Sequence, residues 1–225
     1  MSAGTLILGS GASLASTEIN LGTSGSKGTL NALAAGGITI GNGQTLAGYG
    51  TLVGNTTIAS GGTLAPGNSP GILDITGNLT LNSGSTSIFD VANKVAGVGF
   101  DQVTVSGALN YGGLLQLNIT GSFNDALTKF QGNLFKDFTS ESGNFTLVQY
   151  SLNNGVSWKD LTYYGGALNT WQMWDNSVLS VAGDNGYVGI NLNTGMLTVV
   201  PEPSTWALVV GGVSTLVILR RRKRS

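Results

Sequence analysis

The chain has 225 residues, of which 36 are glycine and only 9% are charged, and it contains no cysteine and no histidine. The missing cysteines exclude disulfides, thiolate chemistry and Cys-based zinc sites, and the missing histidines remove the commonest general base and transition-metal ligand. Through Val200 there are five lysines, no arginine and ten acidic residues, so the body lacks the basic footprint of a nucleic-acid-binding protein. We therefore expect no nucleic-acid partner and no cofactor.

The N-terminal segment has the pattern of a strand followed by a turn. Residues 1–14 read MSAGTLILGSGASL, with neither the basic n-region nor the apolar h-region of a signal peptide. The C-terminus described below indicates export, which requires such a leader. We therefore expect this sequence to be a fragment, or to start downstream of the natural N-terminus.

Residues 1–120 are predicted to form a series of short strands. Apolar and polar residues alternate in runs that Gly, Asn and Ser interrupt, which is the two-residue period of a strand with one buried face. Threonine is the usual polar partner, and its β-branched side chain suits a pleated surface. Such runs occur at residues 5–8, 38–40, 56–58, 72–75, 78–81, 102–105 and 115–119, and again at 145–148.

A repeated tripeptide indicates how these strands are arranged. Gly-Thr-Leu begins at Gly4, Gly28, Gly50 and Gly62, and repeats of about 20 residues or more are typical of solenoids. We predict an all-β fold in which residues 1–120 form a right-handed parallel β-helix, with glycine at the tight corners and Leu, Ile and Val stacked inside. Because the repeat is irregular, an antiparallel β-sandwich or jelly roll is the alternative.

One part of this region resembles a known repeat family. Residues 61–73 read GGTLAPGNSPGIL, and the chain continues with ITGNLTL at 75–81 and FDQVTVSG at 100–107. This pattern is similar to the autotransporter-associated β-strand repeats found in the passenger regions of large surface proteins. The resemblance covers roughly residues 40–120 and implies a β-helical surface protein. The chain departs from that family at its C-terminus, where a different signal stands.

Within this region, residues 67–71 (GNSPG) satisfy the G-x-S-x-G pattern of serine hydrolases. The oxyanion hole of those enzymes uses the backbone N–H of the residue after the serine, and Pro70 has none. The chain also has no histidine to deprotonate Ser69. We therefore predict a turn at this position, which the Pro-Gly dipeptides favour.

Acidic residues offer another route to catalysis, because some β-helical proteins cleave polysaccharides with Asp and Glu alone. Asp90 and Asp101 flank predicted strands, and Asp137 and Glu141 are four residues apart. No spacing singles out a catalytic pair, and a body without arginine and histidine lacks the usual partners for β-elimination. We predict that the protein is not an enzyme, with a polysaccharide lyase or glycosidase as the alternative.

Residues 121–200 are richer in aromatic residues than the region before them. We predict that this region continues the β structure or caps the end of the solenoid, because an open end exposes core and strand edges. A short helix is predicted over 125–138, with Asn124 as its cap. An exposed aromatic platform for sugars is the alternative for these side chains: Phe123, Phe130, Phe135, Phe138, Tyr150, Trp158, Tyr163, Tyr164, Trp171 and Trp174.

Residues 201–225 consist of three parts. Pro201, Glu202 and Pro203 come first, an uncharged run of 14 residues extends from Trp206 to Leu219, and the basic residues Arg220, Arg221, Arg222, Lys223 and Arg224 follow. As a helix, 206–219 spans about 21 Å, which is shorter than the ~30 Å hydrocarbon core. The basic side chains can extend to the head groups, and Trp206 suits the interface. We therefore predict a membrane helix over 206–219 with the body outside the inner membrane.

This order of parts resembles the PEP-CTERM sorting signal of Gram-negative bacteria. The resemblance implies that an exosortase, a membrane transpeptidase-like protease, recognises the motif at 201–203 and that the helix and basic tail (220–224) are then removed. Trp206 and the basic tail would orient the inner-membrane intermediate before processing.

The two resemblances together predict the role of the protein. We expect a non-catalytic exported protein, structural or adhesive, sorted to the cell surface or extracellular matrix. Its outward Thr, Asn and Ser side chains suit contact with extracellular polysaccharide or other surface proteins. The alternatives are a secreted β-helical polysaccharide-active enzyme and an envelope protein that stays anchored because its helix is never cut.

Overall fold

The fold was analysed in a computed structural model, which describes residues 3–67, 70–93, 95–120, 130–151, 154–161, 170–175, 186–191 and 196–201. Across these ranges the chain forms strands, turns and extended connections, and none of their residues is helical. The predicted all-β class is confirmed for this part of the chain.

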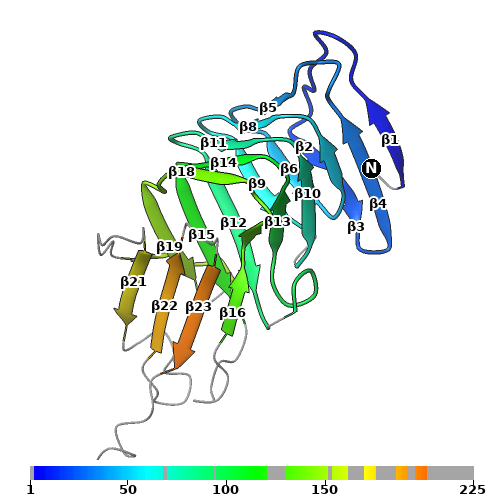
Figure 1. The fold of residues 1–225 in the computed structure, drawn as a ribbon. Coiled ribbons are helices and arrows are strands. Elements are labelled where there is room, and N and C mark those ends of the chain that lie inside the picture. The colour runs from blue at the N-terminus through cyan, green and yellow to red at the C-terminus, as the bar shows by residue number, and fades with distance from the viewer. Residues whose placement is uncertain are drawn as a thin grey trace, which may run out of the picture.

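Three sheets of parallel strands make up most of the molecule (Figure 1). The first contains β1 (Gly4–Ile7), β4 (Ser26–Asn31), β7 (Thr51–Val53), β10 (Ile72–Thr76), β13 (Gln102–Val105) and β17 (Phe135–Lys136), with the short antiparallel β3 (Gly22–Thr23) beside β4. The second contains β5 (Ile38–Ile40), β8 (Thr56–Ile58), β11 (Leu79–Leu81), β14 (Ala108–Tyr111) and β18 (Ser140–Gly143). The third contains β2 (Glu18–Asn20), β6 (Thr45–Gly48), β9 (Thr63–Pro66), β12 (Thr86–Val91), β15 (Leu114–Ile119), β19 (Leu147–Ser151) and the antiparallel β20 (Lys159–Leu161).

From β4 onward the chain visits these sheets in a fixed rotation. It passes from the first to the second to the third sheet and then returns to the first, one position further along. Each passage is one rung, and successive rungs stack in register, as Thr29, Thr51 and Asp74 do. This is the arrangement of a parallel β-solenoid, and the described strands of these three sheets do not form the alternative antiparallel sandwich.

Not every copy of the Gly-Thr-Leu repeat occupies the same position in its rung. Its first three copies stack on one another in the first sheet, where Thr5 pairs with Thr29 and Thr29 with Thr51. The fourth copy, which begins at Gly62, lies in the third sheet, where Thr63 pairs with Thr45. The shorter last interval therefore carries the chain to another face of the solenoid.

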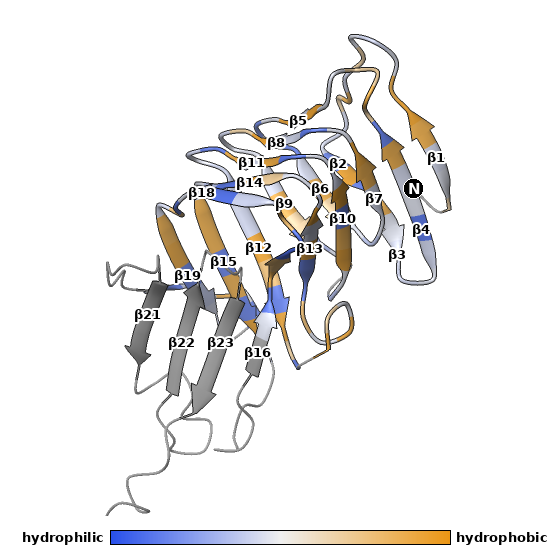
Figure 2. Cartoon of the chain, in the orientation of Figure 1, coloured by the Kyte–Doolittle hydropathy of each residue, from blue (hydrophilic) through white to orange (hydrophobic). Residues whose placement is uncertain are grey.

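Inward side chains form continuous aliphatic columns. In the first sheet, Leu30, Leu52 and Ile75 stack in this way, and each keeps 2% or less of its surface exposed. Burying one such side chain stabilises the fold by about 1.5–3 kcal/mol, so the columns hold the rungs together. Figure 2 shows the resulting alternation of hydrophobic and hydrophilic residues along the strands.

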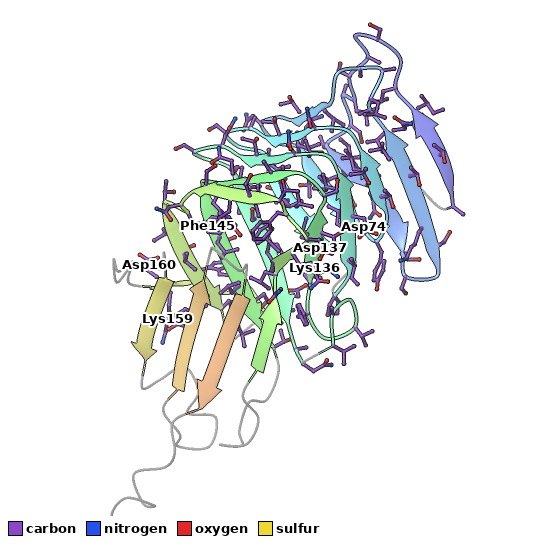
Figure 3. The ribbon with its side chains drawn as sticks, viewed as in Figure 1. Asp74, Lys136, Asp137, Phe145, Lys159 and Asp160 are labelled. Atoms are coloured by element: carbon purple, nitrogen blue, oxygen red, sulfur yellow. The ribbon has the colours of Figure 1, made fainter. Side chains whose placement is uncertain are left out.

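The filling of the core becomes aromatic towards the C-terminal end of the stack. The ring of Phe135 lies 5.0 Å from that of Phe89 and 5.4 Å from that of Tyr111, and Phe145 lies 5.3 Å from Tyr111. Phe135 and Phe145 belong to the rung of β17, β18 and β19, so the parallel stack continues beyond residue 120. Figure 3 shows Phe145 between the sheets.

The helix predicted over 125–138 is wrong for the described part of that range. Residues Phe130–Asn133 form β16, and Phe135–Lys136 form β17. The reason is tertiary, because Phe135 is fully buried beside the aromatic rings of the preceding rungs. Residues 124–129 lie outside the described residues.

A fourth, antiparallel sheet adjoins the end of the stack (Figure 1). Its strands lie in the order β16, β23 (Met196–Pro201), β22 (Gly186–Asn191) and β21 (Thr170–Asp175). Strand β16 leads into β17, which joins this sheet to the last rung. The described residues between 130 and 201 therefore supply both a continuation of the solenoid and a separate sheet beside it.

Candidate functional site

Of the predicted sorting residues, only Pro201 lies within the described part of the chain. It is the last residue of β23 and pairs with Gly186 of β22. Glu202, Pro203, Trp206, Arg220, Arg221, Arg222, Lys223 and Arg224 lie outside the described residues, as does the segment 206–219. Within the residues that are described, no helix has the length and apolar character needed to cross a membrane.

The outer faces of the three sheets carry ladders of uncharged polar side chains. Outward positions in successive rungs are in register, so their side chains repeat about every 4.8 Å along the stack. Threonine forms such a ladder on each sheet: Thr5, Thr29 and Thr51 on the first, Thr39, Thr57 and Thr80 on the second, and Thr45, Thr63 and Thr86 on the third. These faces can offer hydroxyl groups to a partner at regular intervals.

Side chains also link neighbouring rungs on the outside of the solenoid. Gln116 donates a hydrogen bond of 3.0 Å to Gln149, which donates one of 2.8 Å to Asp160 on β20. On the first sheet, the hydroxyl of Thr104 donates to Asp74. Figure 3 labels Asp74 and Asp160, which lie on different faces of the stack. These acids take part in ladders and do not converge on one groove.

The corner between the first and second sheets contains a shallow hollow with both polar and apolar lining. It has a volume of about 260 Å³ and is lined by Leu33, Gly36, Gly37, Gly54, Asn55, Thr76 and Gly77. Beside it, Oδ1 of Asn55 accepts a 3.1 Å hydrogen bond from the N–H of Asn78. Pockets that enclose a small ligand measure about 300–1,000 Å³ and are mostly apolar, so this hollow does not have the form of an enclosed site.

Asp101 occupies the corner between the third and first sheets. Its Oδ1 accepts a 2.6 Å hydrogen bond from the N–H of Gly71, and its Oδ2 accepts a 2.7 Å hydrogen bond from the N–H of Asp90. The N–H of Asp101 in turn donates to the carbonyl of Asp90 at 2.9 Å. The carboxyl group therefore accepts hydrogen bonds from backbone N–H groups of two successive rungs. The neighbouring strand β9 is too short to pair with Asp90, because its register with β12 covers only Thr86 and Ser87.

Burial dominates the electrostatics of this corner. Asp101 keeps only 2% of its surface exposed, and this burial raises the pKa of its carboxyl group to about 7, against the two backbone hydrogen bonds, which lower it. A raised pKa can mark a general acid. Here both carboxyl oxygens are engaged by backbone N–H groups inside the fold, which favours a structural role.

A second polar cluster lies on the outer face of the third sheet. Nδ2 of Asn118 donates to Oδ1 of Asp90 at 2.6 Å and to Oδ1 of Asn154 at 3.1 Å. Asn118 keeps 8% of its surface, and its own Oδ1 is buried without a hydrogen-bond partner. Asp90 is thus the one carboxylate in this cluster, and no group of three potential metal-binding side chains occurs in the described part of the chain.

The other predicted acids and aromatics that the structure describes occupy separate places, whereas Phe123, Tyr163 and Tyr164 lie outside the described residues. Asp137 forms an exposed ion pair of 3.3 Å with its neighbour Lys136, as Figure 3 shows. Glu141 is exposed on β18. Phe135 and Tyr150 are buried in the core, so neither belongs to an exposed sugar-binding platform.

The contact between Asp101 and Gly71 was not predicted from the sequence. The sequence predicted a turn at residues 67–71, of which 68 and 69 lie outside the described residues, and it placed Asp101 beside a strand, but it did not connect the two features. The signal that would connect them is the in-register stacking of Ile72 on Gln102, which places the two preceding residues side by side. Gly67 is also close, since a Cβ on it would lie 2.9 Å from Oδ1 of Asp101.

Comparison of the chain with protein-family models, with curated proteins and with solved structures gave no match.

Proposed function

We propose that this protein is an exported surface or extracellular-matrix protein with a structural or adhesive role, and that an exosortase-type protease recognises its motif at residues 201–203 and sorts and processes it. Its body is a stack of rungs whose outer faces carry threonine ladders. The proposal assigns no catalytic step to the chain. Polysaccharide or another surface protein is the proposed partner of these faces.

The observation that carries the sorting proposal is the C-terminal sequence Pro201-Glu202-Pro203, followed by the apolar run 206–219 and five basic residues. Strand β23 ends at Pro201, so the motif begins where the last described strand stops. Proline supplies no N–H for a sheet and restricts the residue before it.

Threonine ladders support the structural or adhesive part of the proposal. A ladder such as Thr39, Thr57 and Thr80 presents small hydroxyl groups, each a donor and an acceptor, in an extended row. The faces carry few charges, so binding would rest on many weak hydrogen bonds and would depend little on salt. An extended polar polymer suits such a surface better than a compact small molecule does.

The experiment that tests sorting replaces Pro201-Glu202-Pro203 by Ala-Ala-Ala in a host that carries an exosortase. We expect the parent chain to mature to a shorter product that has lost its tail, and the variant to remain full-length in the inner membrane. Intact-mass measurement of both products gives the answer, and Ser204→Ala, just outside the motif, is the matched control.

Two outcomes would reject the sorting proposal. If the Ala-Ala-Ala variant matures and is released like the parent, the motif is not what the protease recognises. If the parent itself keeps residues 206–225 in its mature form, the protein is a permanently anchored envelope protein instead.

A further inference from the structure

A row of asparagines runs along the edge of the second sheet and ties successive rungs together. Oδ1 of Asn55 accepts a 3.1 Å hydrogen bond from the N–H of Asn78, and Oδ1 of Asn78 accepts one of 2.8 Å from the N–H of Ala108. Both asparagines are exposed, and their Nδ2 groups make no hydrogen bond within the described part of the chain. Because the amide group is planar, fixing Oδ1 also fixes the direction of Nδ2. The two outward donors are therefore held in place before any partner binds.

A row of threonine hydroxyl groups lies beside these amides. Thr57 and Thr80 follow Asn55 and Asn78 by two residues, which is about 6.6 Å along an extended strand, and the two threonines are in register. Neither hydroxyl is hydrogen-bonded to any residue that the structure describes. The second sheet thus offers two parallel rows of free donors, each of which repeats once per rung, about every 4.8 Å.

The shallow hollow lies on the other side of the asparagine row. Gly54 and Gly77, which form part of its lining, immediately precede Asn55 and Asn78. The lining also includes Leu33, which keeps 63% of its surface exposed and supplies an apolar wall. Because the hollow is shallow, it suits one unit of a longer chain better than an isolated small molecule.

This face of the solenoid is uncharged. Residues 32–44, 54–62, 77–85 and 106–112 form the second sheet and its two corners on four successive rungs, and they contain no acidic or basic side chain. A strongly charged ligand would find no opposite charge here to compensate its loss of hydration. The face therefore suits an uncharged ligand that is rich in hydrogen-bond acceptors.

On the other two faces, the longer polar side chains are engaged with one another. Gln116 donates to Gln149 and Gln149 to Asp160 on the third sheet, and Thr104 donates to Asp74 on the first. Those groups would have to exchange an internal hydrogen bond for one to a ligand, which reduces the net gain. The amide groups of Asn55 and Asn78 can bind a ligand without such an exchange.

The rows belong to the middle of the stack. They lie on β8 and β11 and at the start of these strands, and β8 and β11 are flanked in the sheet by β5 on one side and β14 on the other (Figure 1). Both neighbouring rungs are part of the described chain. The surface is therefore complete whatever chain precedes or follows the stack.

We propose that this face of the second sheet, with the adjoining hollow, binds an extended, uncharged polysaccharide that lies along the stack. Its oxygens accept hydrogen bonds from the Asn55 and Asn78 amides and from the Thr57 and Thr80 hydroxyls. An extended glycan repeats its hydroxyl and ring oxygens at an interval comparable to the spacing of the rungs. The inference rests on the adhesive part of the proposed function and names the ligand class and the site.

The composition of the face favours a glycan over a protein partner. Specific protein interfaces have a well-packed apolar core, whereas Leu33 is the one large apolar side chain that is strongly exposed among the described residues of this face. Two rows of small polar donors instead suit a ligand that carries acceptors along its whole length. Many weak hydrogen bonds then add up along one polymer.

Replacement of both asparagines by aspartate tests the site. Asn55→Asp and Asn78→Asp keep the oxygen that accepts from the next rung and replace the outward NH₂ donor by an acceptor. Asn93→Asp is the matched control, because Asn93 is also exposed and its Oδ1 accepts a 3.0 Å hydrogen bond from the N–H of Val95, but it lies in the connection from the third sheet to the first. Thermal unfolding checks that each variant is folded.

The full chain, kept in a detergent without sugar head groups, is tested on immobilised cellulose, xylan, mannan and β-1,3-glucan. We expect the parent to bind at least one of these neutral polymers with little dependence on salt. The Asn55→Asp, Asn78→Asp double variant should bind it roughly tenfold more weakly, and Asn93→Asp should bind like the parent. A parent that binds none of the four, or a double variant that binds as well as Asn93→Asp, would overturn the inference.

A second pair of variants avoids any change of charge. Thr57→Val and Thr80→Val together remove two hydroxyl groups and keep the β-branched shape, and we expect binding to weaken about threefold. Thr45→Val with Thr63→Val makes the same change on the third sheet and should have no effect. Equal effects of the two pairs would mean that the second sheet is not the site.

Attachment of the full chain to intact cells separates this inference from the adhesive role itself. If the partner is a polysaccharide, periodate oxidation of the surface sugars should abolish attachment and protease treatment of the cells should not. Attachment that survives periodate but not protease would mean a protein partner, which overturns the inference and leaves the adhesive role in place. A chain that attaches to no cell would reject the adhesive role as well.

Discussion

The backbone N–H of Gly71 donates a 2.6 Å hydrogen bond to Oδ1 of Asp101, and this contact joins two successive rungs at a corner of the solenoid. The other carboxyl oxygen accepts from the N–H of Asp90. One buried side chain therefore completes the backbone hydrogen bonding of the corner. A buried carboxyl group in this role makes the stability of the fold depend on pH.

Replacement of Asp101 by Asn should change how stability varies with pH. Burial raises the pKa of Asp101 from 3.8 to about 7, so between these values the folded protein keeps a proton that the unfolded chain releases. The contribution of Asp101 to the free energy of unfolding is thus complete below about pH 4 and is lost as the pH rises towards 7. Relative to Asp101→Asn, the parent should lose up to about 4 kcal/mol over this range.

Urea unfolding of both proteins at several pH values between 4 and 8 measures this difference. Asparagine keeps one acceptor oxygen and loses the other, which imposes a cost that does not vary with pH. Glu18→Gln, at an exposed carboxylate, controls for the loss of one negative charge. If the free energies of unfolding of the parent and Asp101→Asn varied with pH in the same way, the pKa of Asp101 would not be raised by burial in the folded protein.

Ser87→Ala should stabilise the protein. Ser87 is completely buried in a core column between Leu64 and Leu115, and its hydroxyl has no hydrogen-bond partner. Removing an unsatisfied buried hydroxyl should raise the free energy of unfolding by about 1 kcal/mol. Urea unfolding measures the effect, and Ser140→Ala at an exposed position is the control. A loss of stability in Ser87→Ala would show that the hydroxyl is satisfied in solution.

Gly50→Ala should destabilise the stack, whereas Gly25→Ala should not. A Cβ on Gly50 would lie 2.2 Å from the carbonyl oxygen of Gly28 and 2.3 Å from that of Leu21, while a Cβ on Gly25 would meet nothing within 4 Å. The backbone of adjacent rungs cannot move apart without breaking their hydrogen bonds. We expect a loss of about 3 kcal/mol for Gly50→Ala and less than about 0.5 kcal/mol for Gly25→Ala in thermal or urea unfolding. Equal losses of stability for the two variants would mean that the backbone of adjacent rungs can shift to accommodate a Cβ at residue 50.

Phe135→Ala should weaken the last rung most. The Phe135 ring is fully buried and lies near the rings of Phe89, Tyr111 and Phe145. Its truncation should cost about 3–5 kcal/mol and should increase amide hydrogen exchange in β17 and β19 before it does so in β4. Val156→Ala is the control, because Val156 keeps 82% of its surface exposed. If amide hydrogen exchange increased equally in all rungs, the aromatic cluster would not stabilise the last rung in particular.

Much of the architecture is encoded in short-range patterns. Alternation in segments such as Ile38-Thr39-Ile40 predicts a strand with its isoleucines inside, and the structure buries both. The recurrence of Gly-Thr-Leu predicts stacking of Thr5, Thr29 and Thr51, which is observed. These predictions succeed because side-chain direction along a strand has a strict period of two residues.

Other features depend on contacts that no local pattern contains. The Gly-Thr-Leu copy at Gly62 lies in a different sheet from the other three, and Phe135 is in a strand where a helix was predicted. In both cases burial against another rung decides the outcome, because tertiary packing outweighs local preference. The sorting residues from Glu202 onward remain a prediction from the sequence.

The alternation of apolar and polar residues is enough to establish that the body is made of β-strands, and composition alone removes cysteine and histidine chemistry. Which strand lies on which was settled only in three dimensions, since the in-register spacing of the parallel strands varies from 18 residues between Thr45 and Thr63 to 33 between Gln116 and Gln149. Loops of different length separate the strands, and a strand pairs where its apolar side chains complete a buried column. The hydrogen bond between Gly71 and Asp101 follows from that stacking, because it joins residues that only the winding of the chain brings together.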